Sequence, residues 1–170
     1  MERNNLILPI IIIVVMLVVI LIAFSGSNTF QMGQISFDYP DSWSQNSNVG
    51  DFSNGTLYSE VVFISTFENS DGTSEEAYII VQMQRKNQNS LNLPSPNLLV
   101  ENTTNTTVGS INVANLTATQ LGNYGPDMAE KVTIIEQGNY NLVITYITPT
   151  YALNQTSEAY NQILQTLTIG

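Results

Sequence analysis

Residues 77–85, AYIIVQMQR, decide the fold class of this chain. Every second side chain in this stretch is apolar, and the apolar set is Ala77, Ile79, Val81 and Met83. A period of two is expected of a β-strand that buries one face and leaves the other partly exposed. The stretch therefore predicts a strand of an antiparallel sheet, in which one face commonly packs on the core.

Similar patterns recur outward from this stretch. Apolar or alternating runs predict further strands at residues 35–39, 57–66, 111–121, 128–136 and 140–148. Turn-forming residues separate the runs, namely Pro40-Asp41-Ser42, Asn54-Gly55, Asp71-Gly72 and Gly138-Asn139. Pro and Asp at the second and third positions favour a type I turn in the first case, and Gly-Asn favours a tight hairpin in the last.

Two helices are also predicted. Ser95 followed by Pro96 is a typical helix start, and a short helix is expected from there to about Glu101. Residues 156–168 predict a C-terminal helix, because their apolar side chains fall on one face at helical spacing. Together these elements predict an α+β fold, an antiparallel sheet of about six strands flanked by helices.

An uncharged apolar segment precedes the predicted sheet. Residues 6–24 would form a helix of roughly 28 Å, which matches the hydrocarbon thickness of a bilayer. Arg3 precedes this segment and no Lys or Arg follows it before Arg85, so the N-terminus is predicted to stay in the cytoplasm. We therefore expect a single-pass protein of the cell membrane that enters the lipid bilayer through one transmembrane signal-anchor helix.

The predicted organisation follows from that anchor. Residues 1–5 are cytoplasmic, residues 6–24 cross the membrane, residues 25–33 are a linker, and residues 34–170 form one extracytoplasmic domain. The alternative is a cleaved signal peptide, because the small residues Ala23, Ser25 and Ser27 suit a processing site. The apolar core of such a peptide normally runs only about 7 to 15 residues, which favours the retained anchor.

The composition excludes several kinds of site. The chain has no Cys and no His, which removes thiolate chemistry, the commonest general base and the commonest transition-metal ligand. Its net charge is −10 with only four basic residues, so neither nucleic acid nor an anionic lipid surface is expected as a partner. Residues 68–76 hold four carboxylates that suit Ca²⁺, but Phe67 and Tyr78 would occupy ligand positions of an EF-hand, and a solvated loop is favoured. We expect no enzyme activity, no cofactor and no metal site.

Two elements of the sequence resemble a known family. One is the F-x-Y-P-x-x-W motif formed by Phe37, Tyr39, Pro40 and Trp43, and the other is the stretch YNQILQTLTI at residues 160–169. They resemble the PsbP-like domains, which are named for an extrinsic subunit of photosystem II and are related in fold to the Ran-binding Mog proteins. The resemblance implies a non-enzymatic domain, an antiparallel sheet flanked by helices, that binds another macromolecule. Membrane-anchored versions rich in sequons resemble uncharacterised cell-surface proteins of archaea.

Five N-x-[S/T] sequons are candidate N-glycosylation sites, at Asn54, Asn102, Asn105, Asn115 and Asn154. A chain this rich in Asn, Ser and Thr produces several sequons by chance, so their positions matter more than their number. Four of them fall in predicted turns or loops, and Asn115 falls on the polar face of its predicted strand. Glycosylation at such positions would fit a cell-surface domain.

Three functional hypotheses remain open. The first is a non-catalytic, membrane-tethered module that binds another envelope protein or an extracellular ligand of unknown identity. Its contact face has four candidate tyrosines, although Tyr commonly completes the edge of a core, and these are Tyr58, Tyr78, Tyr124 and Tyr151. The second hypothesis is a hydrolase of envelope polymers that uses paired carboxylates. The third is a structural component of the cell surface.

Overall fold

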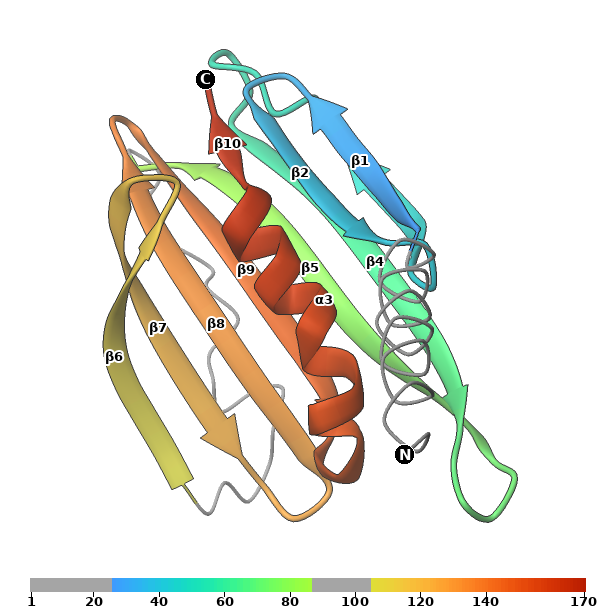
Figure 1. Cartoon of the computed structure of the whole chain (residues 1–170). Coiled ribbons are helices and arrows are strands. Elements are labelled where there is room, and N and C mark those ends of the chain that lie inside the picture. The colour runs from blue at the N-terminus through green and yellow to red at the C-terminus, as the bar shows by residue number, and fades with distance from the viewer. Residues whose placement is uncertain (1–25, 87–104) are drawn as a thin grey trace, which may run out of the picture.

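The computed structural model of the chain describes residues 26–86 and 105–170. Within these ranges the chain forms ten strands in two antiparallel sheets, one α-helix and one short 3₁₀-helix (Figure 1). The strands are β1 (Ser27–Met32), β2 (Ile35–Pro40), β3 (Ser44–Val49), β4 (Tyr58–Glu68), β5 (Ser74–Arg85), β6 (Asn105–Val113), β7 (Leu116–Tyr124), β8 (Met128–Gln137), β9 (Tyr140–Pro149) and β10 (Thr168–Ile169). The helices are η1 (Thr150–Ala152) and α3 (Leu153–Thr166).

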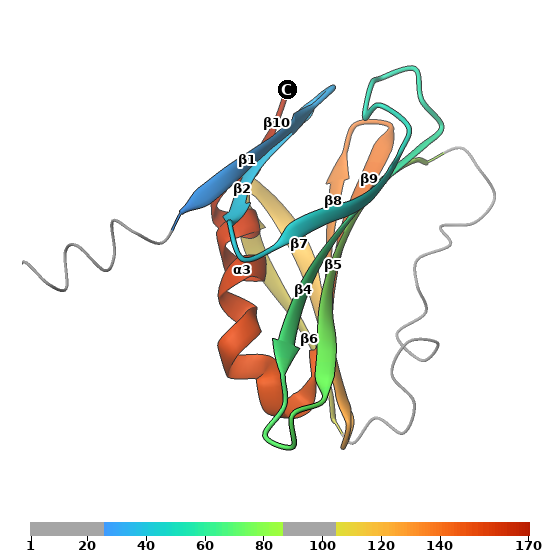
Figure 2. The ribbon, with the colours of Figure 1, turned by 90° about the vertical axis from the view of Figure 1, so that its right-hand side faces the viewer.

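The described elements form two layers. The larger sheet has the strand order β3-β4-β5-β9-β8-β7-β6, and the smaller one has the order β1-β2-β10. Helix α3 and the smaller sheet lie on the same side of the larger sheet, which Figure 2 shows from its edge. We call the side of the larger sheet that they cover the helix face, and the opposite side the far face.

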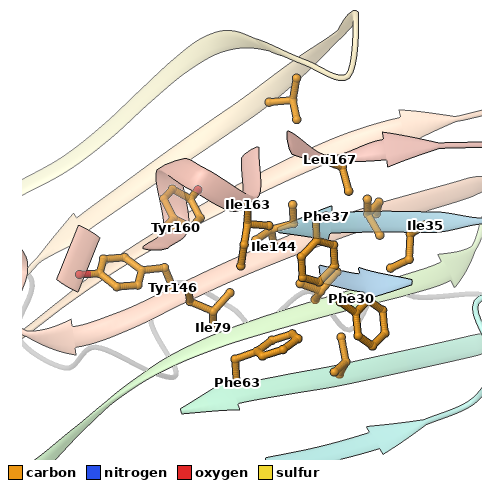
Figure 3. Close-up of a cluster of buried hydrophobic side chains, with 14 of the residues drawn as sticks. Phe30, Ile35, Phe37, Phe63, Ile79, Ile144, Tyr146, Tyr160, Ile163 and Leu167 are labelled. Atoms are coloured by element: carbon orange, nitrogen blue, oxygen red, sulfur yellow. The ribbon is translucent and has the colours of Figure 1, made fainter. Parts of the chain in front are cut away.

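The main core lies between the helix face and its cover (Figure 3). Phe37 of β2 stacks on Phe30 of β1 with ring centroids 5.0 Å apart, and it meets Phe63 of β4 edge-on at 5.7 Å. Further along α3, Tyr160 stacks on Tyr146 of β9 at 5.4 Å. Full burial of one large apolar side chain stabilises a fold by about 1.5–3 kcal/mol, so this interface carries much of the stability.

The alternation of β5 has the predicted outcome. Ala77, Ile79 and Val81 are fully buried and Met83 is 4% exposed, all within the core of the helix face. Strand β9, the centre of the sheet, is buried at all ten positions, which means that its side chains on the far face are buried too. The predicted hairpin is also confirmed, since Gln137 pairs with Tyr140 across Gly138, whose φ is +51°.

The predicted α+β fold is wrong. The described part of the chain is mainly β, with ten strands and a single α-helix in place of about six strands and two helices. Two strands escaped prediction because they are polar. β3 (SQNSNV) is exposed at every position, and β1 buries only Phe30, so neither shows an apolar period. β1 also lies within residues 25–33, which the sequence predicts to be a linker, so that prediction is wrong for Ser27–Met32.

A turn divides the strand predicted at residues 111–121 into β6 and β7. Ala114 and Asn115 form that turn in the left-handed backbone region, with φ values of +50° and +62°. The small and polar residues of the turn continue the alternation of the strands around them, which concealed the break. The helix predicted at residues 95–101, the anchor at residues 6–24 and the N-terminal residues 1–5 lie outside the described residues. Within residues 26–86 and 105–170, no helix is long and apolar enough to cross a bilayer.

Candidate functional site: a polar groove beside Trp43

The candidate site begins at the turn that follows β2. The backbone N–H of Trp43 donates to the carbonyl of Pro40 at 3.0 Å, and the N–H of Asp41 donates to the carbonyl of Gly26, also at 3.0 Å. The turn therefore spans Pro40 to Trp43, one residue later than predicted. The reason is that Pro40 still pairs with Ser27 in the smaller sheet, which extends the strand through the proline.

Helix α3 supplies the opposite wall. Its apolar stripe, which includes Ala159, Tyr160 and Ile163, is buried against the sheets. A stripe of polar side chains at helical spacing lies beside it and turns toward the β2–β3 turn. Between the turn and this stripe is a groove of about 600 Å³, lined by Gly26, Ser27, Pro40, Asp41, Ser42, Trp43, Gln155, Thr156, Glu158, Ala159, Asn161, Gln162 and Gln165.

The lining of the groove is rich in carboxamides. Gln155, Asn161, Gln162 and Gln165 each present a carbonyl that accepts hydrogen bonds and an NH₂ group that donates them. The charged groups among the described lining residues are the carboxylates of Asp41 and Glu158, with no Lys or Arg beside them. This arrangement suits an uncharged polar segment or one with a cationic group, and it disfavours an anion.

The F-x-Y-P-x-x-W motif builds this end of the molecule. Phe37 and Trp43 are 1% and 5% exposed, and the ring of Tyr39 lies 4.5 Å from that of Phe63. Pro40 and Trp43 also line the groove. Phe37 and Tyr39 of the motif therefore pack in the core, while Pro40 and Trp43 form one wall of the groove. The glutamines of α3 gave no signal in the sequence, because a polar stripe opposite an apolar one is what any solvated helix shows.

Two of the candidate glycosylation sites are exposed in turns. Asn54 lies in the turn between β3 and β4. Asn115 lies in the turn between β6 and β7, and not on the face of a strand as predicted. Both side chains are open to solvent, so both positions are accessible to modification in the folded domain.

The other three sequons differ. Asn154 was expected in a loop but lies in the first turn of α3, and the threonine of its sequon, Thr156, is 6% exposed and bonded to the backbone carbonyl of Ala152 at 3.0 Å. Asn105 was also expected in a loop and begins the edge strand β6. Asn102 lies outside the described residues. Folding therefore buries part of one sequon and places another in a sheet.

The acidic loop at residues 68–76 is a hydrogen-bonded hairpin. The carboxylate of Asp71 accepts hydrogen bonds from the hydroxyl of Thr73 at 2.6 Å and from its backbone N–H at 2.9 Å. These bonds hold the pKa of Asp71 below its ordinary value. Glu75 accepts from the amide of Asn69 at 3.1 Å. Among residues 26–86 and 105–170, no group of three or more His, Cys, Asp or Glu side chains could hold a metal ion.

The four tyrosines proposed for a contact face do not converge. Tyr58 and Tyr78 stand on the far face but are separated along the strands, since Tyr58 pairs with Gln84 at the end of the β4–β5 pair and Tyr78 pairs with Ile64 near its middle. Tyr151 packs at the end of β9 against Phe67, with centroids 6.2 Å apart. Burial, aided by a hydrogen bond to Glu60, raises the pKa of Tyr58 to about 12. Tyr124 lies on β7, so the four side chains come from different parts of the sheet.

Fold and groove together define a mainly β, two-layer domain. Its carboxamide-lined groove lies between the β2–β3 turn and α3, the single α-helix among the described residues. No family model matches the chain, and no curated protein matches it. The resemblance to the PsbP-like family therefore stays a prediction, and the α+β arrangement expected with it is not the one adopted.

Several solved structures are similar in shape at low sequence identity. A protein from Bacteroides thetaiotaomicron VPI-5482 is 12% identical with a TM-score of 0.49, over 86% of this chain and 49% of that one, so this chain spans about half of its length. LpqN of Mycobacterium tuberculosis, involved in cell envelope biogenesis, is 15% identical with a TM-score of 0.47, over 85% of this chain and 90% of that one. PA94 of Pseudomonas aeruginosa, a protein of unknown function, is 18% identical with a TM-score of 0.42, over 82% of this chain and 94% of that one.

Proposed function

We propose that this chain is a membrane-anchored, non-catalytic binding domain outside the cytoplasm, whose groove holds an uncharged polar segment of another envelope protein. The observation that carries the proposal is the row of carboxamides along α3 that faces the β2–β3 turn. A peptide backbone offers alternating N–H donors and C=O acceptors, and carboxamides are the side chains that match both. The absence of a basic residue from the lining favours such a neutral segment over an acidic one.

The place of the groove fits a ligand held close to the membrane. Gly26 lines the groove, and the predicted anchor ends at residue 24. With so short a connection, the groove would lie beside the bilayer surface, since two residues span at most about 7 Å. A partner held there would be another membrane protein or a protein that lies against the membrane.

Site-specific cross-linking tests this function. The chain contains no cysteine, so a single cysteine at Gln162 carries a photo-activated cross-linker to the groove without competing sites. The matched control is Gln137→Cys, an exposed glutamine at the end of β8, away from the groove. With the full chain in its own membranes, we expect one dominant cross-linked protein from position 162 and none from position 137. Equal products from both positions, or none from either, would contradict a binding role for the groove.

A hydrolase is a second candidate, because the two carboxylates Asp41 and Glu158 both line the groove. Glycoside hydrolysis uses two such groups about 5 to 9.5 Å apart, one of them as the acid. Asp41→Asn and Glu158→Gln would each abolish turnover of envelope glycans if the groove is an active site. In that case the cross-linking pattern at position 162 would show glycan in place of protein. If the parent chain turns over no envelope glycan, the hydrolase hypothesis is contradicted and the binding hypothesis is not affected.

A further inference from the structure

The outer edge of β6 has no partner strand among residues 26–86 and 105–170. β6 closes one side of the larger sheet and pairs on its inner side with β7, from Asn105↔Tyr124 to Val113↔Leu116 (Figure 1). This pairing runs over all nine residues of β6 without a register shift. A straight strand of that length presents a row of free N–H and C=O groups, which can pair with another extended chain.

The turn at the end of β6 identifies the residues that carry these free groups. Ala114 and Asn115 both have positive φ and form a two-residue hairpin loop, so Val113 and Leu116 exchange both backbone hydrogen bonds. Hydrogen-bonded and non-hydrogen-bonded pairs alternate along an antiparallel ladder. The odd-numbered residues of β6 therefore bond to β7. The N–H and C=O groups of the even-numbered residues point away from the sheet, at positions 106, 108, 110 and 112.

The opposite edge of the larger sheet is protected against such pairing. β3 changes register between Gln45 and Ser47, Asp51 follows it closely, and Glu60 lies on the neighbouring strand β4. Bulges and charged side chains are common means of preventing an edge strand from pairing. β6 has neither, and residues 105–126 contain no charged side chain in a chain whose net charge is −10. The edge of β6 can therefore approach a second acidic chain without repulsion between like charges.

Gly109 lies at the centre of β6, where the packing of the described residues requires no glycine. A Cβ atom at Gly109 would meet no atom of these residues within 4 Å, its φ is not positive, and β6 has no bulge there. At Gly122 of β7, in contrast, a Cβ atom would lie 2.7 Å from the hydroxyl oxygen of Thr107, so packing explains that glycine. A glycine weakens a strand, and inside one it often marks the close approach of another backbone.

We propose that β6 pairs with β6 of a second copy of this chain, antiparallel and with Gly109 opposite Gly109, so that the two larger sheets become one. All nine residues overlap in this register, and Val108 of each copy lies opposite Ser110 of the other. The outward N–H and C=O groups of both strands then find partners, and the side chain of Val108, 70% exposed in the single chain, is partly covered. The groove beside Trp43 adjoins the β3 side of the sheet, so each copy keeps its own.

The symmetry of this pairing fits two chains in one membrane. An antiparallel pair of identical strands is related by a two-fold axis perpendicular to the sheet, and such a contact closes after two copies. The rotation keeps the helix faces of both copies on one side, together with β1 and its first residue Ser27 (Figure 2). Both predicted anchors would then enter the same bilayer. One strand per copy buries less than the about 1,600 Å² of a standard interface, so we expect the dimer where anchoring concentrates the chains.

Cysteine cross-linking of the full chain in membranes tests the pairing and its register, because the chain has no cysteine of its own. Gly109→Cys places two thiols opposite each other, with Cα atoms about 4.5 Å apart, which a disulfide spans. Val108→Cys is the matched control, since its copy lies on the diagonal at about 7–8 Å. We expect mild oxidation to give covalent dimer from Gly109→Cys roughly 10-fold faster than from Val108→Cys. Mixing Val108→Cys chains with Ser110→Cys chains should restore the cross-link.

Val108→Pro provides a second measurement. The N–H that it removes points away from β7, so the single chain should keep its fold, while the dimer loses a hydrogen bond from each copy. Added to Gly109→Cys, it should lower the rate of dimer formation by roughly 10-fold, with an unchanged circular dichroism spectrum.

Three results would overturn the proposal. The first is the absence of covalent dimer from Gly109→Cys, or its cross-linking to a different protein. The second is equal dimer formation from Gly109→Cys, Val108→Cys and Val49→Cys, a 54% exposed position on β3, because random collision would then explain the product. The third is a dimer that forms at the same rate when Val108→Pro is present in a folded chain.

Discussion

The helix face and the far face of the larger sheet are made from the same strands, but they differ in the state of their buried polar groups. On the helix face the hydroxyls of Thr133 and Tyr160 bond to each other, and Gln120 donates to both at 3.3 Å. On the far face the hydroxyl of Thr145 has no partner. An unpartnered buried polar group costs about 1–3 kcal/mol, so the far face carries an energetic cost at Thr145 that the helix face avoids at Thr133.

The largest loss of stability is expected from a substitution in the core of the helix face. Phe37→Ala removes a ring that contacts Phe30 and Phe63 in the centre of the core. We expect a loss of about 3–5 kcal/mol in the free energy of unfolding, as for other large-to-small core changes. Urea denaturation followed by circular dichroism measures it. Val108→Ala, at an exposed position, should change stability by less than about 0.5 kcal/mol, and a similar loss in both variants would mean that the core has been misassigned.

A matched pair of isosteric changes compares the two faces directly. Thr133 and Thr145 are both fully buried on neighbouring strands, but only Thr133 has hydrogen-bond partners. Thr133→Val removes the hydroxyl that bonds to Tyr160 and leaves Tyr160 with only the amide of Gln120, and it should cost about 1–3 kcal/mol. Thr145→Val removes an orphan and should be neutral or slightly stabilising, by up to about 1 kcal/mol. A large loss from Thr145→Val would instead reveal a donor that reaches this hydroxyl.

Glu130 gives the far face a pH dependence. Burial raises the pKa of this carboxyl above its ordinary value, against the opposing effect of a hydrogen bond from Asn123 at 3.2 Å. A raised pKa in the folded state stabilises the fold below the pKa of the unfolded chain, and that contribution is lost as the pH rises through the folded pKa. Glu130→Gln should therefore gain stability relative to the parent chain as the pH rises from about 4 toward neutrality.

Asp71 is the control for this titration, because hydrogen bonds lower its pKa in the folded state. Its contribution is present above the pKa of the unfolded chain and is lost as the pH falls through the folded pKa. Asp71→Asn should therefore differ from the parent at neutral pH and converge with it in acid. Urea midpoints measured at several pH values for both variants should show these opposite trends, and parallel trends would contradict the assigned burial of Glu130.

The sequence was informative where one face of a strand is buried and the other is not. Alternation in residues 77–85 assigned the side chains of β5 to the correct faces, and the Gly138-Asn139 pair located a hairpin. Strand β3 escaped because an edge strand with both faces in solvent has no period to detect. The Ala114-Asn115 turn escaped because small residues in the left-handed region leave the alternation on either side unbroken.

The candidate site was harder to predict, because it is made of residues that carry no chemical signature alone. Trp43 and Pro40 were noted only as part of the F-x-Y-P-x-x-W motif, and the glutamines of α3 resembled an ordinary solvent-facing stripe. Only the position of α3 beside the smaller sheet, on the same side of the larger one, brings the two sets together. The contact between Glu130 and Asn123 was equally hidden, since the two residues are seven positions apart and meet only through the pairing of β7 with β8.

The central position of strand β9 affects the order in which the domain can fold. It joins β5 to β8, so Val81 finds its neighbour Ile144 only when most of the chain is available. Pairings between distant segments slow folding, because loop closure must precede the gain from the contacts. A chain synthesised from its N-terminus would therefore hold β3, β4 and β5 as a sheet with an open edge at β5 until β9 arrives.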